Sequence, residues 1–129
     1  MEVNVKNLEK KEDERGWLIE VLRADEIGEE IKQIYFTTIK PGKVRGNHYH
    51  KKKVDWLCVV KGKAKISVLN PANGEKKEIL VNGKKPKIIK LKPGIAHAVK
   101  NIGSEDVHLI GIVNETFDPK DPDTYPLKI

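Results

Sequence analysis

Residues 45–64 read RGNHYHKKKVDWLCVVKGKA, and this stretch carries the signals that decide the fold. Its second half, VDWLCVV at 54–60, is rich in β-branched and aromatic residues and stops at Lys61-Gly62, which predicts a strand followed by a turn. Side chains alternate between the two faces of a strand. One face then carries Asp55, Leu57 and Val59, and the other carries Val54, Trp56, Cys58 and Val60.

The predicted strand at 54–60 is apolar on both faces, so both faces need to be covered. Two arrangements satisfy this requirement. In the first, the strand is central and lies between two layers of one subunit. In the second, Trp56 and Cys58 lie in the interface of a homodimer. The sequence leaves both arrangements open.

Segments of the same kind recur along the chain and are separated by turn signals such as Pro41-Gly42 and Pro93-Gly94. Asn82-Gly83 lies between two of them and is typical of a type I′ hairpin, while residues 24–31 are the helix candidate. The pattern predicts an all-β fold, a sandwich or barrel of the jelly-roll type. The predicted strands are 17–22, 31–39, 54–60, 64–69, 77–81, 86–91, 96–99 and 107–113.

The chain has 129 residues, a length that predicts one domain over residues 1–129. Its single cysteine, Cys58, excludes an intramolecular disulfide and favours a reducing compartment. The N-terminus lacks the apolar segment of a signal peptide, and the sequence contains no stretch of about 18 apolar residues that could cross a membrane. We therefore expect a cytoplasmic protein without a membrane partner.

The net charge of +6 is unevenly distributed. Residues 1–30 carry 5 basic and 10 acidic groups, whereas residues 40–100 carry 17 basic and 3 acidic groups. The basic middle part would attract anions such as the phosphates of a small nucleotide. Nucleic acid is not an expected partner, because the cations are 22 Lys against 3 Arg and aromatic residues make up only 5%.

Three of the four histidines form a pattern that suggests a metal site. His48 and His50 flank Tyr49 on an extended segment, so both imidazoles are expected on one face. Asp55 follows shortly afterwards, and His97 begins another predicted strand. Three imidazoles and one carboxylate suit a borderline divalent ion such as zinc, manganese, iron, nickel or cobalt.

The spacing of these residues resembles the two cupin motifs, which supply two His and a Glu from the first motif and one His from the second. The resemblance implies a cupin, a small jelly-roll β-barrel. The sequence departs from the motifs at two places: Asp55 stands where cupins usually have Glu, and Pro93 directly adjoins Gly94 where the motif has a spacer. Because Asp is one methylene shorter than Glu, the backbone would need to come closer to the ion.

Three segments resemble the C-terminal cupin domain of the bacterial capsular polysaccharide assembling protein family: residues 45–64, LKPGIAHAVKNIGSED at 91–106 and VNETFDPKDPDTYPLKI at 113–129. In that family a zinc-containing cupin domain epimerises carbon 3 of a UDP-linked 2-acetamido-6-deoxy-4-hexulose. An N-terminal reductase domain then reduces the ketone with NADPH. The resemblance implies that this chain corresponds to the cupin half, since it has no GxGxxG, and that a separate NADPH-dependent reductase acts in the same pathway.

DERGWLIEV at 13–21 and the Arg45-Gly46 pair are more distantly similar to dTDP-4-keto-6-deoxyglucose 3,5-epimerases and 3,4-ketoisomerases. Those relatives are generally metal-free and use the histidine aligned with His48, or with His50 in the ketoisomerases, as the proton acceptor. The 3,5-epimerases also use a tyrosine as general acid near the last strand. Phe117 occupies that neighbourhood here, so this resemblance implies that the acid is missing.

The resemblances imply roles for further residues. If the imidazoles hold a metal, the proton carrier would be metal-bound hydroxide, Tyr49, a lysine or another carboxylate, whereas without metal His48 or His50 would be the base. Arg45 is expected to reach the diphosphate of the substrate, and Asn47 is expected to contact the substrate as well.

Together with the sequence, these resemblances imply an isomerase, active as a homodimer in surface polysaccharide synthesis. It would epimerise carbon 3 of a UDP- or dTDP-linked 4-keto-6-deoxy hexose through a metal-stabilised enolate. One alternative is a metal-free 3,5-epimerase or 3,4-ketoisomerase of dTDP-4-keto-6-deoxyglucose. The other alternative is a sugar-binding cupin without catalytic activity.

Overall fold

The computed structural model describes residues 3–129, which form two five-stranded antiparallel sheets and one small two-stranded sheet. The elements are β1 (Asn4–Asn7), β2 (Lys11–Asp13), β3 (Gly16–Leu18), the 3-10 helix η1 (Ala24–Glu26), β4 (Gln33–Ile39), β5 (Val44–Tyr49), β6 (Asp55–Lys61), β7 (Lys63–Asn70), β8 (Glu75–Asn82), β9 (Lys87–Leu91), β10 (Ala96–Asn101), β11 (Val107–Val113) and β12 (Tyr125–Pro126).

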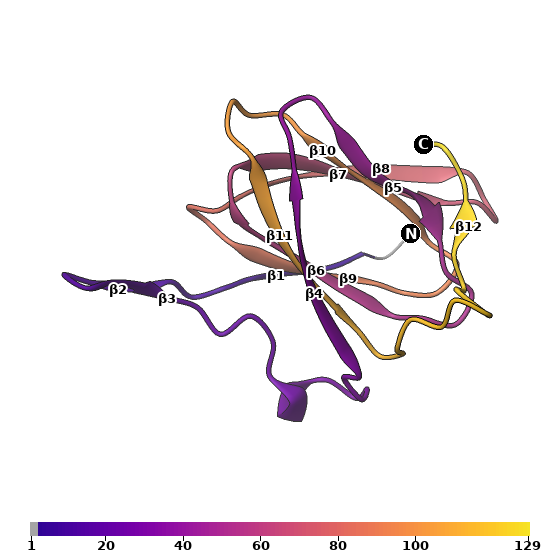
Figure 1. Cartoon of the computed structure of the whole chain (residues 1–129), viewed down its shortest axis with the longest axis horizontal. Helices are drawn as coiled ribbons and strands as arrows, with labels where there is room; N and C mark the ends of the chain where they lie inside the picture. The colour runs from indigo at the N-terminus through magenta and orange to yellow at the C-terminus, as the bar shows by residue number, and fades with distance from the viewer. Residues whose placement is uncertain (1–2) are drawn as a thin grey trace.

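The two large sheets have the strand orders β1-β9-β6-β11-β4 and β12-β5-β10-β7-β8. Figure 1 shows them as the two layers of the body, with the β2–β3 hairpin projecting away from it. Strands that follow one another in sequence are repeatedly placed in different sheets, as a jelly roll requires. The structure confirms the predicted all-β, cupin-type jelly-roll β-barrel.

The core between the two sheets is built from the inner faces of their strands. Leu57 and Val59 of β6 contribute to it, as the alternation of side chains predicts, and both are about 1% exposed. The other buried members come from both sheets and include Ile39, Ala64, Ile66, Val68, Val81, Ile89, Leu91, Val99, Val107 and Leu109. These apolar side chains fix the distance between the sheets. The site described below lies where polar side chains take their place between the sheets.

The outer face of β6 is covered by the chain itself. Trp56 is 2% exposed and Cys58 is fully buried. The cover is provided largely by the segment that precedes β4, and its half-buried residues are Leu8, Ile19, Val21, Leu22, Ile27 and Ile31. The first arrangement, with both faces covered within one subunit, is therefore confirmed, and the placement of Trp56 and Cys58 in a homodimer interface is wrong. The homodimer itself stays a prediction.

Truncation of Trp56 tests this cover. We expect Trp56→Ala to lower the free energy of unfolding by about 3–5 kcal/mol, because the indole is fully buried and its removal leaves a cavity. Urea unfolding followed by circular dichroism measures the change. The matched control is Phe36→Ala, which removes a ring that is 58% exposed and should change stability by less than about 0.5 kcal/mol. Equal effects of the two variants would contradict the described cover.

Three local predictions are wrong in detail. Residues 24–31 do not form a two-turn helix, and only Ala24–Glu26 is helical, as a 3-10 turn. Of residues 17–22 only the start is a strand, because Ile19, Val21 and Leu22 are used to cover β6. Asn82-Gly83 does form a tight turn, closed by the Asn82–Lys85 bridge, but it joins strands of different sheets and not a hairpin.

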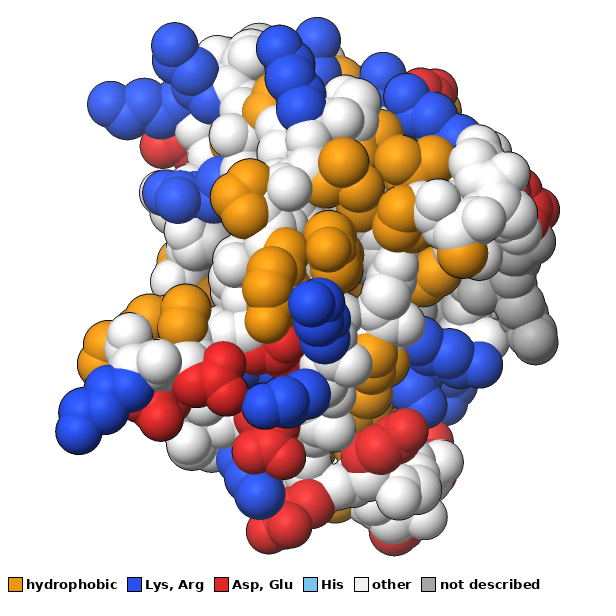
Figure 2. All heavy atoms as spheres, turned by 90° about the vertical axis from the view of Figure 1, so that its right-hand side faces the viewer, with side chains coloured by type: hydrophobic (Ala, Val, Ile, Leu, Met, Phe, Trp, Pro, Cys, Tyr) orange, Lys and Arg blue, Asp and Glu red, His pale blue; other side chains and the backbone are white. Residues whose placement is uncertain are grey.

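The charge asymmetry of the sequence is visible on the surface. In Figure 2 the acidic side chains gather at the lower end of the molecule, the end at which η1 lies in Figure 1, and Lys and Arg dominate the upper part. Asp25 and Glu26 of η1 belong to the acidic end. No helix within residues 3–129 is long and apolar enough to cross a membrane. The cytoplasmic location stays a prediction.

Candidate active site

The three imidazoles predicted to act together do meet inside the barrel. The ring centroids of His48 and His97 are 4.7 Å apart, those of His48 and His50 are 5.1 Å apart, and those of His50 and His97 are 6.0 Å apart. His48 and His97 are directly paired across β5 and β10. Asp55 joins them from the opposite sheet, as the first residue of β6, after the chain bends at residues 51–52. The predicted constellation of His48, His50, Asp55 and His97 is therefore one cluster.

A bulge in β5 sets the direction of His48. Gly46 has a φ of 96° and Asn47 a φ of 56°, and the register between β5 and β10 shifts at this point. A Cβ atom on Gly46 would lie 2.8 Å from the carbonyl oxygen of His97, so the two strands can approach this closely only with glycine there. Bulges commonly redirect a side chain next to a functional site.

His50 is held by an acceptor on each side of its ring. Its Nδ1 lies 2.6 Å from the backbone carbonyl of Asp123, and its Nε2 lies 2.9 Å from Oδ2 of Asp55. Both partners are acceptors, so the imidazole satisfies both of them only when it carries a proton on each nitrogen. Burial alone would lower the pKa of His50, but the hydrogen bond and the charge of Asp55 together raise it. His50 and Asp55 thus form an ion pair.

His48 and His97 are neutral, in contrast to His50. Burial, followed by the nearby charge of His50, lowers the pKa of His48. Burial lowers the pKa of His97 to about 4, and its Nδ1 is buried without a hydrogen-bond partner. A neutral imidazole has a free lone pair, so both rings can accept a proton at neutral pH.

The cluster does not fit a metal ion in this arrangement. A doubly protonated His50 has no lone pair left for a metal, and Asp55 is turned to that ring. Within residues 3–129 no group of three or more His, Cys, Asp or Glu side chains is arranged to hold an ion. A metal would need His50 to lose a proton and the ion pair with Asp55 to open.

A cavity of about 330 Å³ opens next to the two neutral imidazoles. This volume is at the lower end of the range for small-molecule sites. One wall is formed by β5 and β10, with His48 and His97, and the other by β4, β6 and β11 of the opposite sheet. The remaining lining residues are Tyr35, Thr37, Arg45, Gly46, Leu57, Val99 and Leu109.

Tyr35 brings a phenol into this cavity that was not singled out from the sequence. The residue pairs with Gly111 across β4 and β11, and its ring lies over that glycine, where a Cβ atom would overlap it. Burial, and next the charge of Asp55, raise the pKa of Tyr35, so its hydroxyl stays protonated. Tyr35 and His48 belong to opposite sheets and line the same cavity. A proton acceptor and a proton donor therefore face the space from two sides.

Of the other predicted site residues, Arg45 lines the cavity, whereas Asn47 and Tyr49 do not. Arg45 is also exposed, and its Nε donates to the carbonyl of Thr38 at 2.9 Å. Asn47 is used by the chain itself, since its Oδ1 accepts from the N–H of Ile129 at 3.0 Å. Tyr49 is not among the cavity residues, and its ring stacks on Tyr125 at 5.4 Å. The structure brings Arg45 to the imidazoles but not Asn47 or Tyr49.

Lys53 lies near the cluster, and its Nζ lies 5.5 Å from the centroid of the Phe117 ring. Phe117 is 58% exposed and is not among the cavity residues, so it does not occupy the place of a general acid. Lys53 is buried, its Nζ donates to the carbonyl of Pro122 at 3.1 Å, and its charge helps to lower the pKa of His48. Sequence reasoning could not select this lysine, because only the bend before β6 distinguishes it from its neighbours.

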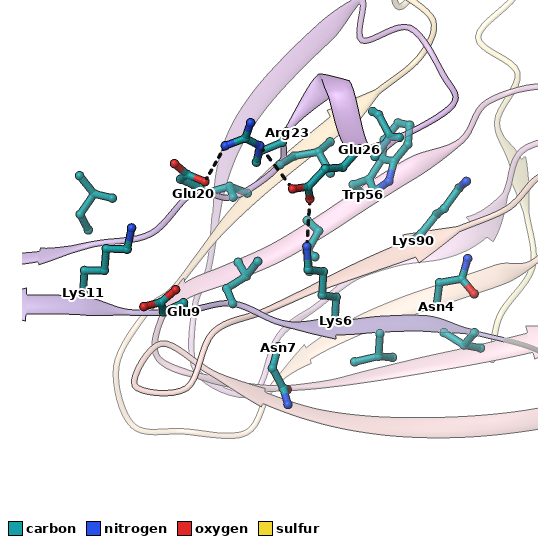
Figure 3. Close-up of a pocket in the computed structure, with 18 residues that line it drawn as sticks. Asn4, Lys6, Asn7, Glu9, Lys11, Glu20, Arg23, Glu26, Trp56 and Lys90 are labelled. Carbon is teal, nitrogen blue, oxygen red and sulfur yellow. Dashed lines mark hydrogen bonds and ion pairs between the residues drawn. The ribbon is translucent and has the colours of Figure 1, made fainter.

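A larger cleft, of about 610 Å³, lies on the outer face of the first sheet. Figure 3 shows β1 and residues 18–27 around it, with Trp56 at its side. Three of its cations are paired: Lys6 with Glu26 at 3.1 Å, Arg23 with Glu20 and Glu26, and Lys90 with Glu29. The cleft contains none of the imidazoles. The chemistry of the site therefore belongs to the smaller cavity.

Comparison with known proteins places the chain in a family. The model of the polysaccharide biosynthesis C-terminal domain matches residues 11–125. The chain belongs to this family. A probable low-salt glycan biosynthesis epimerase, Agl13, of Haloferax volcanii is 30% identical over 132 residues, which cover 95% of this chain and 83% of that protein. The epimerase name of this relative agrees with the predicted enzyme class, isomerase.

Two longer proteins are similar to this chain over part of their own length. The UDP-2-acetamido-2,6-beta-L-arabino-hexul-4-ose reductase of Pseudomonas aeruginosa is 37% identical over 117 residues, 91% of this chain and 30% of that protein. The crystal structure of the capsular polysaccharide assembling protein CapF of Staphylococcus aureus superposes with a TM-score of 0.75 and 34% identity, over 95% of this chain and 34% of that one. The chain thus spans about a third of these relatives, and the resemblance to the capsular protein is confirmed.

Proposed function

We propose that this member of the family epimerises carbon 3 of a UDP- or dTDP-linked 4-keto-6-deoxy hexose by proton transfer. The observation that carries the proposal is the pairing of a neutral imidazole and a protonated phenol on opposite walls of one cavity, His48 and Tyr35. Agl13 is named an epimerase and the Pseudomonas relative is named for a UDP-linked 4-hexulose, and both names support this substrate class.

The ketone at carbon 4 makes the proton on carbon 3 acidic, and removal of this proton is the first step. His48 is the base, because its lone pair is free and it lines the cavity. His97 is more deeply buried than His48, at 4% exposure, and we assign it no proton transfer. The electrons of the broken C–H bond move into an enolate. Positive charge at the cluster, on His50 and Lys53, favours that developing negative charge.

Inversion at carbon 3 requires that the proton return to the opposite face of the sugar. Tyr35 is the donor, since its phenol lies on the sheet that faces His48. The hydroxyl gives its proton to carbon 3, and the phenolate then takes a proton from water while His48 releases one. One base and one acid on opposite sides are enough for one stereocentre.

The cavity accommodates the sugar, and the nucleotide lies outside it. A volume of about 330 Å³ leaves little room for a nucleoside diphosphate in addition to the hexose. Arg45 lines the cavity and is exposed, where a diphosphate would pass. Because Asn47 is occupied by the C-terminal residues, we do not retain it as a substrate contact.

Incubation of the nucleotide-linked 4-hexulose in deuterated water, followed by NMR, tests the proposal. We expect deuterium at carbon 3 only, with the ketone still at carbon 4. Deuterium at carbon 5 would move the assignment to the 3,5-epimerases, and a ketone at carbon 3 would move it to the ketoisomerases. A protein that binds the nucleotide sugar but exchanges no proton would be a binding cupin.

The divalent ion predicted from the sequence stays a prediction. The ion pair of His50 with Asp55 leads us to propose a reaction that does not depend on an ion. We expect protein treated with a chelator to keep its rate of exchange within about twofold, because the proton transfers described use protein groups only. Elemental analysis before and after treatment provides the control. About one ion per chain, whose removal abolishes exchange, would restore the metal-stabilised enolate.

Two partners stay predictions. A separate NADPH-dependent reductase is suggested by the reductase name of the Pseudomonas protein, of which this chain matches 30%. The homodimer is compatible with the projecting β2–β3 hairpin, in which Trp17 is 44% and Leu18 is 58% exposed.

A further inference from the structure

We propose that Asp123 is a positioning residue that holds the His50–Asp55 pair from the C-terminal segment. The effect of Asp123 substitutions on turnover rests on the proposed function, whereas their effect on the hydrogen bond of the His50 ring does not. Asp123 lies 10 residues after the end of β11 and far from the cluster in sequence, yet it is 5% exposed and contacts both the ring of His50 and the backbone that follows it.

The carboxylate of Asp123 binds the bend that joins β5 to β6. Its Oδ1 accepts the backbone N–H of Lys51 at 2.9 Å, and its Oδ2 accepts those of Lys52 at 2.9 Å and Lys53 at 3.0 Å. Burial would raise the pKa of Asp123, but these three hydrogen bonds lower it. Three amide donors on one carboxylate fix the conformation of the bend, and the bend carries His50 at one end and Asp55 at the other.

The backbone of the same residue binds the ring. The carbonyl of Asp123 accepts from Nδ1 of His50 at 2.6 Å, a short hydrogen bond. Asp123 has a φ of 47°, a conformation that residues other than glycine seldom adopt and that persists where several contacts enforce it. With this conformation one residue directs its carboxylate to the bend and its carbonyl to the imidazole.

Contacts on either side fasten the segment to β5 and the bend. Lys53 Nζ donates to the carbonyl of Pro122, β12 pairs with the end of β5, and the N–H of Leu127 donates to the carbonyl of Asn47 at 2.8 Å. The C-terminal segment therefore runs along β5 from residue 47 to the bend. Its anchor at Asp123 sets the rotation of the His50 ring, and the ring in turn presents Nε2 to Asp55.

Two substitutions of Asp123 test the proposal. Asp123→Asn keeps the size but replaces one acceptor by a donor, and Asp123→Gly removes the carboxylate while easing the backbone conformation, so it is the variant that tolerates the φ of 47°. The matched control is Asp121→Asn, an exposed neighbour whose ion pair with Lys52 is at the surface. All variants are first compared with the wild type by circular dichroism.

The first readout is the proton on Nδ1 of His50, observed by NMR of the full chain and assigned by its loss in His50→Gln. We expect a slowly exchanging downfield signal in the wild type and in Asp121→Asn, and its loss or upfield shift in both Asp123 variants. Absence of the signal in the wild type overturns the proposal, and so does an unchanged signal in a folded Asp123 variant.

The second readout is the exchange reaction. We expect kcat to fall about 10-fold to 100-fold in the Asp123 variants with KM changed by less than about twofold, because the cluster is misplaced while Arg45 and the cavity opening are untouched. A wild type that shows the signal but exchanges no proton would refute the proposed function and leave the positioning of His50 in place. A folded variant with an altered signal and unchanged kcat would refute the catalytic part of this inference.

Discussion

Replacement of His48 by Gln is expected to lower the rate of proton exchange at carbon 3 by about 10²- to 10⁴-fold, the contribution of a general base. Of the two neutral imidazoles in the cavity, His48 is the less buried. Among the lining residues that the structure describes, we therefore choose it as the proton acceptor. Glutamine keeps most of the volume of the ring and cannot accept the proton. NMR of the substrate in deuterated water measures the rate.

The matched control is His108→Gln, which changes the same residue type outside the cavity. The His108 ring lies against Phe36, with centroids 5.4 Å apart and in an edge-to-face arrangement, and is not among the cavity residues. This variant should keep the exchange rate within about twofold. An unchanged rate in His48→Gln would contradict the assignment of the base and would leave His97 as the acceptor.

The pH dependence of the wild type follows from the same assignment. Because burial and the charge of His50 lower the pKa of His48, the base stays free below its ordinary value of 6.5. We expect kcat/KM to remain constant from neutral pH down to that value and to fall as the pH drops further, since protonation removes the lone pair. A fall that begins above pH 7 would identify a base with a raised pKa.

Much of the cluster could be predicted from the sequence because its geometry is local. The alternation of side chains along a strand is enough to place His48 and His50 on one face, and the bend after them returns Asp55 to the same region. The same rule separated the two faces of β6. What the rule could not show is which element covers Trp56, because the covering segment has no regular period and is apolar only at scattered positions.

The remaining site residues depend on contacts distant in sequence. The strand at 31–39 was predictable, but Tyr35 becomes a cavity residue only through its register with Gly111 on β11. Asp123 reads as part of a polar turn until its hydrogen bonds to residues 51–53 are known. The HYHKKKVD stretch predicts two imidazole ligands and one carboxylate ligand, and this metal set stays a prediction; the structure shows in addition that His50 and Asp55 contact each other directly. A hydrogen bond between two predicted ligands has no signature in their spacing.

Replacement of Tyr35 by Phe is expected to separate proton exchange from inversion. His48 can still remove the proton and return one from solvent to the same face of carbon 3, so deuterium continues to enter the substrate. Formation of the epimer should fall by about 10²- to 10⁴-fold, because the donor on the opposite wall is lost. Parallel measurement of deuterium content and of the two epimers by NMR distinguishes this result from His48→Gln, which should lose both.

Gly111→Ala provides a second route to the same phenotype. A methyl group at this position would overlap the Tyr35 ring, so the phenol must move out of the cavity although it is chemically intact. Tyr125→Phe is the matched control, since it removes a hydroxyl from a ring that stacks on Tyr49 outside the cavity. If Tyr35→Phe still forms the epimer at the wild-type rate, the acid is another group. If exchange and inversion fall together in Tyr35→Phe, the phenol acts on the enolate oxygen or in binding and not as the donor to carbon 3.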